Sequence, residues 1–553
     1  MASLNPKTSA LGTVFAKHLL RRSSFVYTKD VINQFSSLTP TQALDLLFVK
    51  DTPILPLPYD PTPIATPDGF WTEVPASITA PSAFASQTRK RSIVAGWWWY
   101  NAINSPTLKY KICHFLSTRF TVEKSLCGAS SYFYDHIRLL LYYSTNGNYK
   151  ELAKKISLDN AMLVYLNNTS NSKLAPNENY AREFLELFTI GKGPQIAAGN
   201  YTNYTEADVV QAARVLTGFR LKSDRTLIDS TTGIPKGYNV FSTHDNTSPK
   251  VFSSAFGNTS IASATSATAM DAELDSFVNM VFNKQATAKN ICRKMYIYFV
   301  KSTITPEVET DIITPLAADL FANGYNILPI LRRLLTSEHF YDLDDSNAAD
   351  ETLGGIIKSP LQQISELVTY LKATIPSPVT NSYEYYINFW NNFIHDTFLN
   401  GANMILFDPD NVAGHPAYYQ APDFDKTWIS SSTLIAKYRL GESLLDGFNR
   451  ISGNANIKAK INISDVIKNG GLISDALDPY ILTSELCNAL FAQEPDADRI
   501  NYFMNSFLLQ GLATFYWTTA WSTYLSDGKN LVVEPRLKLL VTKISSAPES
   551  QIF

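Results

Sequence analysis

The sequence of 553 residues is 45% apolar and 12% aromatic, which provides enough apolar surface to bury a large core. Its 47 Lys and Arg residues nearly balance its 50 Asp and Glu residues, giving a net charge of −3. The charges include no basic block of the kind that follows a phosphate backbone, so we expect a folded globular protein without a nucleic-acid partner.

The N-terminal stretch is MASLNPKTSALGTVFAKHLLRR. It lacks the basic-then-apolar order of a signal peptide, and no window of the chain approaches the ~18 apolar residues needed to cross a bilayer. We therefore expect no membrane span and a cytoplasmic location. A chain that has lost its signal peptide would look the same, which leaves a periplasmic or extracellular location open.

Four Ser-Pro or Thr-Pro pairs each precede a run of apolar residues at helical spacing. The hydroxyl caps free backbone N–H groups, and a proline at the first helical position gives up an N–H that has no partner. Because period-two strands are scarce, we expect an all-α protein. The four pairs are Thr39-Pro40, Ser105-Pro106, Thr305-Pro306 and Ser359-Pro360.

Three stretches rich in Pro or in Ser, Thr and Asn interrupt the helical pattern, at 51–88, 222–268 and 373–386. Such compositions are typical of irregular surface excursions. We expect residues 1–553 to form one helical unit, with these excursions as the best candidates for lobe boundaries if the unit is two-lobed. Segment 222–268 is expected to be peripheral.

Residues 175–191, APNENYAREFLELFTIG, form the densest polar cluster. Asn177 is placed to cap a helix from Glu178 to Ile190, which Gly191 would end. In this helix Glu178, Arg182 and Glu186 lie at i, i+4 spacing on one face. Leu185 falls within this charged line, which indicates that the charged face also meets protein and is at least partly buried.

A second helix is predicted in YTEADVVQAARVLTGF. Thr205 is its cap, Asp208 takes the capping-box position and Gly218 ends it. The short, Gly-rich loop before it would turn this helix back against the first one. We therefore expect Arg214 to face the acidic line.

Two interpretations of the cluster remain open. In the structural one, Arg182 lies between two carboxylates and fixes how helices dock, with Arg22, Asn177, Asn179, Tyr180 and Arg214 as binding residues. In the catalytic one, crowding raises the pKa of a carboxyl group among Glu178, Glu183 and Glu186. Arg182 and His18 would then give electrostatic support, since His18 and Arg22 are i, i+4 neighbours in HLLRR.

The sequence offers no sign of a metal or cofactor. Its seven histidines include no i, i+4 pair and no HExxH, and no P-loop, GxGxxG or GxSxG motif stands in the required context. The segment DPDNVAG from Asp408 begins like a calcium loop but has Val412 and Ala413 at positions that need an oxygen ligand and a glycine. We expect no metal and no cofactor.

Long motifs spread along the chain resemble the bacterial family known as domain of unknown function 1800. They include AKHLLRRSSF (16–25), KNICRKMYIYFV (289–300), IIKSPLQQISELV (356–368) and DPDNVAGHPAYYQAPDFDKTWISSSTLIAKY (408–438). The resemblance implies a mainly α-helical unit and no established activity. Relatives are often encoded beside phosphatase-like proteins of the domain of unknown function 1501 family, which implies a protein partner.

One departure from the family pattern concerns histidines. Many relatives carry a Trp-His-Asn-His-Phe-like run where this chain reads HFLSTRF, so that Ser117, Thr118 and Arg119 replace the imidazoles and His114 is out of register. If those histidines bind metal or act in catalysis in relatives, this chain has lost that site.

Two classes of function are compatible with these patterns. The preferred one is a non-catalytic binding or assembly protein that acts with a protein partner. The alternative is a hydrolase or lyase on an extracellular polymer that uses the Glu and Arg residues of 177–186. An enzyme should gather these residues at an open cleft, whereas a joint should bury them without one.

Overall fold

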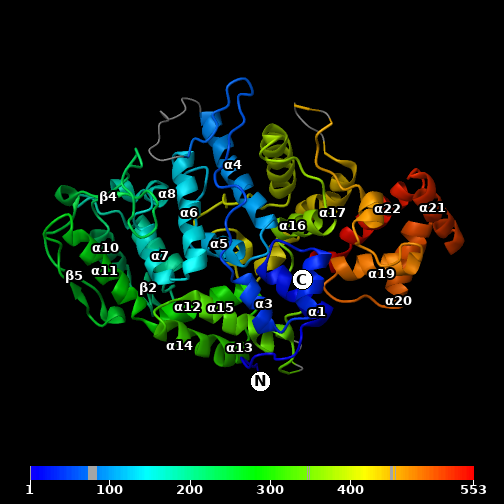
Figure 1. The fold of residues 1–553 in the computed structure, drawn as a ribbon. Helices are drawn as coiled ribbons and strands as arrows, with labels where there is room; N and C mark the ends of the chain where they lie inside the picture. Colours follow the sequence, from blue (N-terminus) through cyan, green and yellow to red (C-terminus); the bar gives the residue numbers. More distant parts are fainter. Residues whose placement is uncertain (1, 73–83, 346, 348, 449–452, 455) are drawn as a thin grey trace.

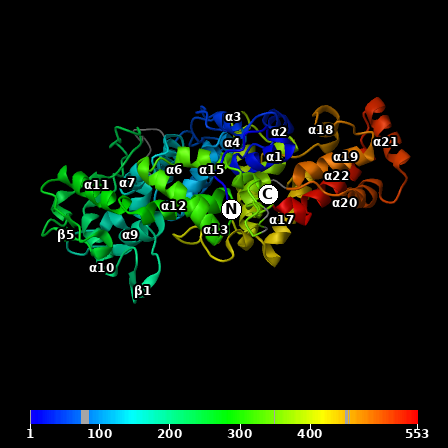
Figure 2. The same cartoon turned by 90° about the horizontal axis from the view of Figure 1, so that it is seen from below.

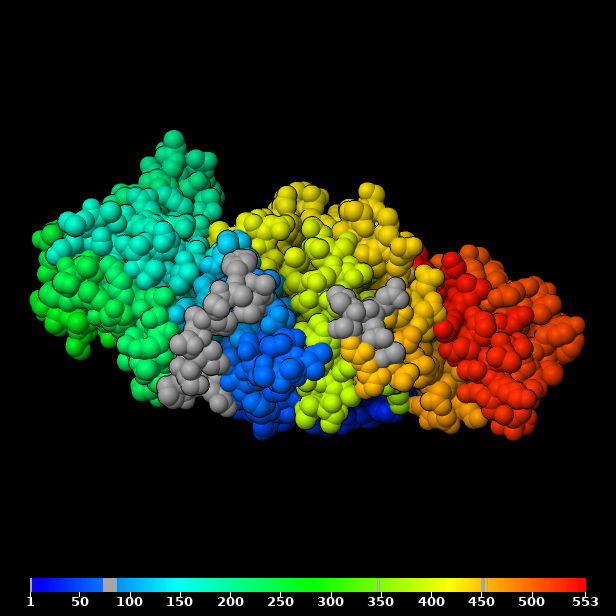
Figure 3. Space-filling view, turned by 90° about the horizontal axis from the view of Figure 1, so that it is seen from above, coloured from blue at the N-terminus to red at the C-terminus, as the bar shows by residue number. Residues whose placement is uncertain are grey.

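The computed structural model describes residues 2–72, 84–345, 347, 349–448, 453–454 and 456–553. These residues form an elongated body, in which segments near 200–280 and near 480–540 lie at opposite ends (Figures 1 and 3). The helices at the N-terminus lie in the middle of the body, near the C-terminus. The chain is predominantly helical, as the sequence predicts.

The elements of the described residues are mostly short helices. The α-helices are α1 (Gly12–Ser23), α2 (Lys29–Ser36), α3 (Pro40–Leu47), α4 (Phe84–Ile103), α5 (Lys109–Ser117), α6 (Ser130–Asn146), α7 (Tyr149–Ile156), α8 (Asn160–Tyr165), α9 (Glu178–Glu183), α10 (Glu206–Val215), α11 (Ala269–Phe282), α12 (Gln285–Phe299), α13 (Pro306–Val308), α14 (Thr314–Ala322), α15 (Ile327–Thr336), α16 (Pro360–Tyr370), α17 (Ser431–Asp446), α18 (Ile463–Asn469), α19 (Pro479–Leu490), α20 (Ala497–Phe503), α21 (Thr514–Asp527) and α22 (Val533–Ser545).

Within the described residues the chain also forms four π-helical segments, seven short 3-10 helices and three two-stranded antiparallel sheets. The π-helices are η2 (Phe184–Phe188), η5 (Glu309–Ile313), η7 (Glu384–Leu399) and η10 (Met504–Leu509). The strand pairs are β1 (Gln195–Ala197) with β2 (Asn200–Tyr201), β3 (Phe219–Arg220) with β4 (Tyr238–Asn239), and β5 (Lys250–Val251) with β6 (Ser260–Ile261). The β1–β2 hairpin extends away from the body (Figure 2).

Three of the four predicted helix starts are confirmed. Thr39 forms a full capping box at α3, and Thr305 and Ser359 cap α13 and α16. The prediction at Ser105-Pro106 is wrong, because α5 begins only at Lys109. The Ser105 hydroxyl instead donates to the carboxylate of Asp51, so it is not available to cap a helix.

Helix α4 carries three consecutive tryptophans that all belong to the core. Trp97, Trp98 and Trp99 point in different directions, yet each is at most 3% exposed. Neighbours surround the helix on several sides, since α4 packs on both α6 and η7. The Trp97 and Trp99 indole N–H groups donate to Leu55 O and Ser365 Oγ, which satisfies them within the core.

Segment 222–268 is not peripheral, and this expectation from its polar composition is wrong. Phe252, Phe256 and Ile261 are buried in the main core. Arg225 is also buried and forms a two-pronged ion pair with Asp135 of α6, with N···O distances of 2.7 and 2.8 Å. A few apolar anchors and buried ion pairs therefore dock a segment whose average composition is polar.

The other two excursions are described in part. Leu55 in 51–88 is buried; its N–H donates to Asn101 Oδ1, and its carbonyl oxygen accepts from Asn101 Nδ2. Residues 73–83 lie outside the described residues. In 373–386, Thr374 pairs with Lys460 through two backbone hydrogen bonds, and η7 begins at Glu384. Among the described residues, no helix combines the length and apolar character that a membrane crossing requires.

Candidate functional site

Helix α9 begins as the sequence predicts but is shorter. The Asn177 side chain accepts a hydrogen bond from Asn179 N at 3.0 Å and caps the helix. After Glu183 the backbone widens into the π-helix η2, which ends at Phe188 instead of continuing as an α-helix to Ile190. The Thr189 hydroxyl donates to Phe184 O, five residues back. A π-helical turn inside a polar motif is frequent at functional sites.

We expected Arg182 to bridge Glu178 and Glu186. The expectation is correct for Glu178 and wrong for Glu186. Arg182 donates two hydrogen bonds of 2.7 Å to Glu206, in the first turn of α10, and one of 3.1 Å to Glu178. The two parallel bonds match the planar fork of the guanidinium, a geometry that the i+4 carboxylate of Glu186 does not provide. The cluster is also less buried than expected, with side chains exposed by 32% for Arg182 and 44% for Glu206.

Glu186 belongs to a separate polar group. Its carboxylate forms an ion pair of 2.5 Å with Lys192 and accepts a hydrogen bond of 3.1 Å from the hydroxyl of Tyr204. Both partners come from the loop that connects α9 to α10. Glu186 therefore helps to hold this loop against the helix pair.

Glu183 has the electrostatic environment that a general acid needs. Burial and the neighbouring carboxylate of Glu186 raise its pKa to about 7, against the opposing charges of Arg182 and Lys192. Near neutral pH such a carboxyl group exists in both protonation states. Of the three carboxylates predicted from the sequence, Glu183 is the one whose pKa its surroundings raise toward neutrality.

Asn177, Asn179 and Tyr180 contact their own protein. The Asn177 and Asn179 amides donate to the carbonyl oxygens of Asn167 and Leu166, at 3.2 and 3.4 Å. The hydroxyl of Tyr180 is buried and lies 2.9 Å from that of Ser157. These side chains fix α9 to the preceding loop and to the end of α7.

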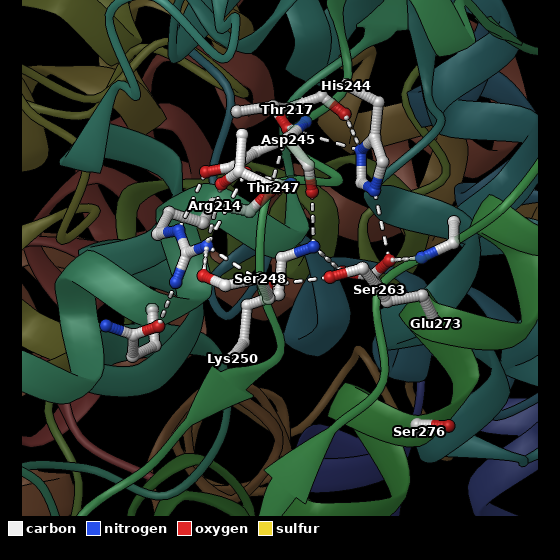
Figure 4. A network of polar contacts seen from close by, with 12 residues as sticks. Arg214, Thr217, His244, Asp245, Thr247, Ser248, Lys250, Ser263, Glu273 and Ser276 are labelled. Carbon is white, nitrogen blue, oxygen red and sulfur yellow. Dashed lines mark hydrogen bonds and ion pairs between the residues drawn. The ribbon is translucent and has the colours of Figure 1, made fainter.

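Arg214 does not face the acidic line, so this expectation is also wrong. It forms an ion pair of 2.7 Å with Asp245 (Figure 4). The same network continues to a fully buried group in which Glu273 contacts Lys250 at 2.6 Å and His244 at 3.0 Å. The partner of Arg214 therefore comes from segment 222–268, through the carboxylate of Asp245.

His18 and Arg22 are not partners of the acidic line either. The imidazole Nε2 of His18 donates to Phe340 O at 2.9 Å, and burial beside Arg22 holds its pKa well below the usual value. Arg22 donates to the carbonyl oxygens of Val300, Thr352 and Phe553. Because α1 lies in the middle of the body, its cations join distant segments of the core.

A small cavity beside Arg22 gathers polar residues that sequence reasoning did not single out. It holds about 40 Å³, which suffices for a few water molecules and not for a polymer segment. The Lys111 ammonium donates to Gln362 Oε1 at 2.5 Å, and burial lowers its pKa to about 7. The polar residues that line this cavity are Arg22, Lys111, His114, Tyr298, Ser302, Ser359, Gln362, Tyr418 and Asp425.

Most of this lining comes from the motifs that carry the family resemblance. Gln362 lies in 356–368, and Tyr418 and Asp425 lie in 408–438. These residues are hundreds of positions from Arg22, so sequence proximity does not connect them. Their place in the family motifs is the signal that could have identified them. The side chain of Gln362 accepts from Lys111, and Ser359 caps α16 by accepting a hydrogen bond from Gln362 N.

A second cavity, of about 20 Å³, lies beside the HFLSTRF segment. Its lining includes His114, Ser117, Thr118, His136 and His415. The ring nitrogens face protein partners, with His136 2.9 Å from Asp159 and His415 3.2 Å from Ile405 O. Burial lowers the pKa of His415 to about 4, so its ring is neutral.

Metal-ligating side chains are not clustered in the part of the chain that the structure describes. No group of three or more His, Cys, Asp and Glu residues there has the arrangement to hold a metal ion. The four cysteines are buried thiols, and burial raises the pKa of Cys113 and Cys127 to about 12. These thiols are poor nucleophiles because the thiolate is disfavoured.

Comparison with known proteins identifies the family. The family model described as "Protein of unknown function (DUF1800)" matches residues 18–551, so the chain belongs to this family. No curated protein and no solved structure matches the chain. The resemblance carried by the sequence motifs is thereby confirmed.

Proposed function

We propose that this member of the family is a non-catalytic binding or assembly protein that acts with a protein partner. The observation that carries the proposal is a set of exposed apolar side chains on α21 and on the segments directly before and after it, here called the α21 surface. It comprises Leu512 (42% exposed), Phe515 (59%), Tyr516 (51%), Leu525 (44%), Leu531 (81%) and Val532 (55%).

The α21 surface lies on a helix that is already fixed to the body by its other face. Trp517, Trp521 and Tyr524 are each at most 6% exposed, and the Trp517 indole donates to Ala476 O at 2.9 Å. The exposed side chains are therefore displayed on a supported helix at the end of the molecule (Figure 1). Large apolar side chains that gather on a surface mark sites of association.

The chemistry of the α21 surface favours a protein over a lipid bilayer. Among residues 512–532 the only charged side chains are Asp527 and Lys529, so the surface lacks the basic cluster that attracts anionic lipid. Aromatic side chains, tyrosine among them, are enriched in protein interfaces. The partner is thus a protein with an apolar contact patch; the phosphatase-like family implied by the sequence resemblance supplies the first candidate.

The polar motif residues give additional support. His18, Arg22, Tyr180 and Arg214 bind groups of their own protein, and Arg182 forms its ion pairs within the α9–α10 unit. This is the pattern of joints between helices. The cavity beside Arg22 and the one beside His136 hold water-sized volumes and not a polymer substrate.

The test compares a double substitution on the α21 surface with a single substitution elsewhere as its control. Phe515→Ser with Leu531→Ser removes apolar contacts from the α21 surface, and Leu174→Ser removes a side chain that is 90% exposed near α9. The wild-type protein and both variants are purified by affinity from the native organism, and each protein that binds is identified, purified and titrated directly.

We expect one purified protein to bind the wild type and the Leu174→Ser control equally and to bind the double variant at least tenfold more weakly. Melting temperatures should be equal within error, because exposed side chains contribute little to folding. Equal binding of the double variant would overturn the proposal. The proposal would also be overturned if the wild type bound lipid vesicles, or self-associated in sedimentation, and the double variant did not. The α21 surface would then serve a membrane or a second copy of the chain.

A specific observation also supports the alternative function, a hydrolase or lyase on an extracellular polymer. The carboxyl group of Glu183 has a pKa of about 7 and lies where α9 changes to a π-helix. It would act as general acid or base, with Arg182 nearby as electrostatic support. Glutamine substitutions, argued at the end of the Discussion, separate this alternative from the binding function.

A further inference from the structure

A cleft of about 390 Å³ lies between the first half of α4, the loop after α5 and the π-helix η7. This volume falls in the range of sites that hold small-molecule ligands. It is far larger than the water-sized cavities beside His114. The cleft is lined by Thr88, Arg89, Arg91, Ser92, Lys124, Ser125, Ile387, Asn391, His395, Asp396 and Asp408.

Lys124 is the central charge of the cleft. Its side chain is 5% exposed, and its ammonium group lies 3.1 Å from both Asp408 Oδ2 and His395 Nε2. An ammonium group has three N–H donors, so two are used and one is left for a ligand. Ser125 is fixed beside it, because its backbone N–H and its hydroxyl both donate to Asp408 Oδ1 at 3.0 Å.

The imidazole of His395 is oriented by a second carboxylate. Its Nδ1 donates to Asp396 Oδ1 at 2.6 Å, which leaves Nε2 as the acceptor for Lys124. Burial lowers the pKa of His395, so the ring is neutral near pH 7. The histidine thus holds the ammonium group in place without adding a charge.

The charges of the described lining favour an anionic ligand. Three cations, Arg89, Arg91 and Lys124, face two carboxylates, Asp396 and Asp408. Asp408 is engaged by Lys124 and Ser125, while Asp396 binds His395 at the open side and is 55% exposed. Arg89 is 31% exposed at the side chain and lies 3.6 Å from the buried Asp60, which anchors it.

We propose that this cleft binds the oxyanion group of a small molecule, a phosphate or a carboxylate. Lys124 and the guanidinium of Arg89 serve as the charged donors. Arginine suits planar or tetrahedral oxyanions because its N–H groups form a fixed fork, and the lysine adds a compact charge. The volume leaves room for a body of several heavy atoms beyond the anionic group, with Ile387 as an apolar contact.

The proposal is tested with inorganic phosphate and with succinate, each titrated by calorimetry at constant ionic strength. Two substitutions on the open side change the charge in opposite directions. Arg89→Gln should weaken binding about fivefold, and Asp396→Asn should strengthen it about fivefold, as expected for one charge at a partly exposed site. Arg333→Gln, at an exposed ion pair on α15, is the matched control and should leave affinity unchanged.

The gain expected for Asp396→Asn cannot arise from misfolding, so the test does not depend on stability alone. Preference between the two probes identifies whether the natural ligand carries a phosphate or a carboxylate. Absence of saturable binding of both probes to the wild type would overturn the proposal. It would also be overturned by equal affinities in all four proteins, or by a stronger response to Mg²⁺ than to either anion.

Discussion

Arg22 Nη2 donates a hydrogen bond of 2.7 Å to the backbone oxygen of Phe553, which lies 531 positions later in the chain. The guanidinium also lies 4.6 Å from the centre of the Phe553 ring, and it donates to Val300 O and Thr352 O. One side chain therefore joins α1 to three distant segments. Burial lowers the pKa of this arginine to about 9, against the charges of Asp425 and Asp342.

The first prediction concerns this joint. Arg22→Met keeps most of the side-chain length but leaves three buried carbonyl oxygens without a donor. We expect the free energy of unfolding to fall by about 3 kcal/mol or more. Urea denaturation measures it, with Arg333→Met as the control at an exposed pair, where the change should stay within about 0.5 kcal/mol. If Arg22→Met unfolded at the same urea concentration as the wild type, the joint would be dispensable.

Local signals of the sequence were sufficient to predict helices, but they could not predict partners. Thr39 and Thr205 each cap their helix as predicted, because a cap depends only on residues three positions away. The partners of Arg22 are more than 270 positions away, and no local pattern specifies them. Because local patterns do not specify partners, the prediction that Arg182 would bind Glu186 was also wrong.

The second prediction revises the expected importance of Arg182. If the charged side chains of Glu178, Arg182 and Glu186 had been buried, Arg182→Ala would lower the free energy of unfolding by about 3 kcal/mol. Because the side chains of Arg182, Glu178 and Glu206 are 32%, 42% and 44% exposed, we expect about 1 kcal/mol or less. The loss should shrink further in 1 M NaCl, since salt screens exposed charges. A loss of about 3 kcal/mol that is insensitive to salt would show that the pair is desolvated in solution.

Composition misled the prediction for segment 222–268 for a different reason. Its average polarity conceals a few buried side chains, and burial is decided residue by residue. Burial alone would raise the pKa of Glu273, but hydrogen bonds from His244 and Lys250 hold it below its usual value. No sequence pattern indicates that Lys250, 23 positions earlier, is the residue that balances this buried carboxylate.

The third prediction follows from this network. Glu273→Gln leaves the ammonium group of Lys250, which is fully buried, without a carboxylate. We expect a loss of about 3 kcal/mol and faster cleavage by trypsin within residues 222–268. Glu273→Gln combined with Lys250→Met should recover part of the loss, because no unpaired charge remains. A double variant that is no more stable than the single one would contradict the role given to this pair.

The last prediction decides whether the polar motif is catalytic, and it depends on Glu183. A carboxyl group whose pKa in the folded state is raised to about 7 binds its proton more tightly there than in the unfolded chain, where the pKa is near 4.5. Below pH 4.5 both states are protonated and the group has no effect on stability. Between pH 4.5 and 7 the unfolded chain loses its proton first, so stability falls as pH rises.

Glu183→Gln should therefore remove the fall in stability between pH 4.5 and 7. We expect the variant to match the wild type near pH 4 and to be more stable near pH 8, by about 1 kcal/mol after allowance for solvent screening. Glu178→Gln and Glu186→Gln, which lose exposed ion pairs, should change stability by about 0.5 kcal/mol at either pH. Melting curves at the two pH values measure these differences.

The same three variants are then tested for complementation of a deletion strain. If the motif is only a joint, Glu183→Gln is stable and restores the phenotype, because it keeps the shape of the helix. If Glu183 is a general acid or base, the variant is equally stable but inactive, since glutamine cannot transfer the proton. A stable, inactive Glu183→Gln beside active Glu178→Gln and Glu186→Gln would replace the binding function proposed here with a catalytic one.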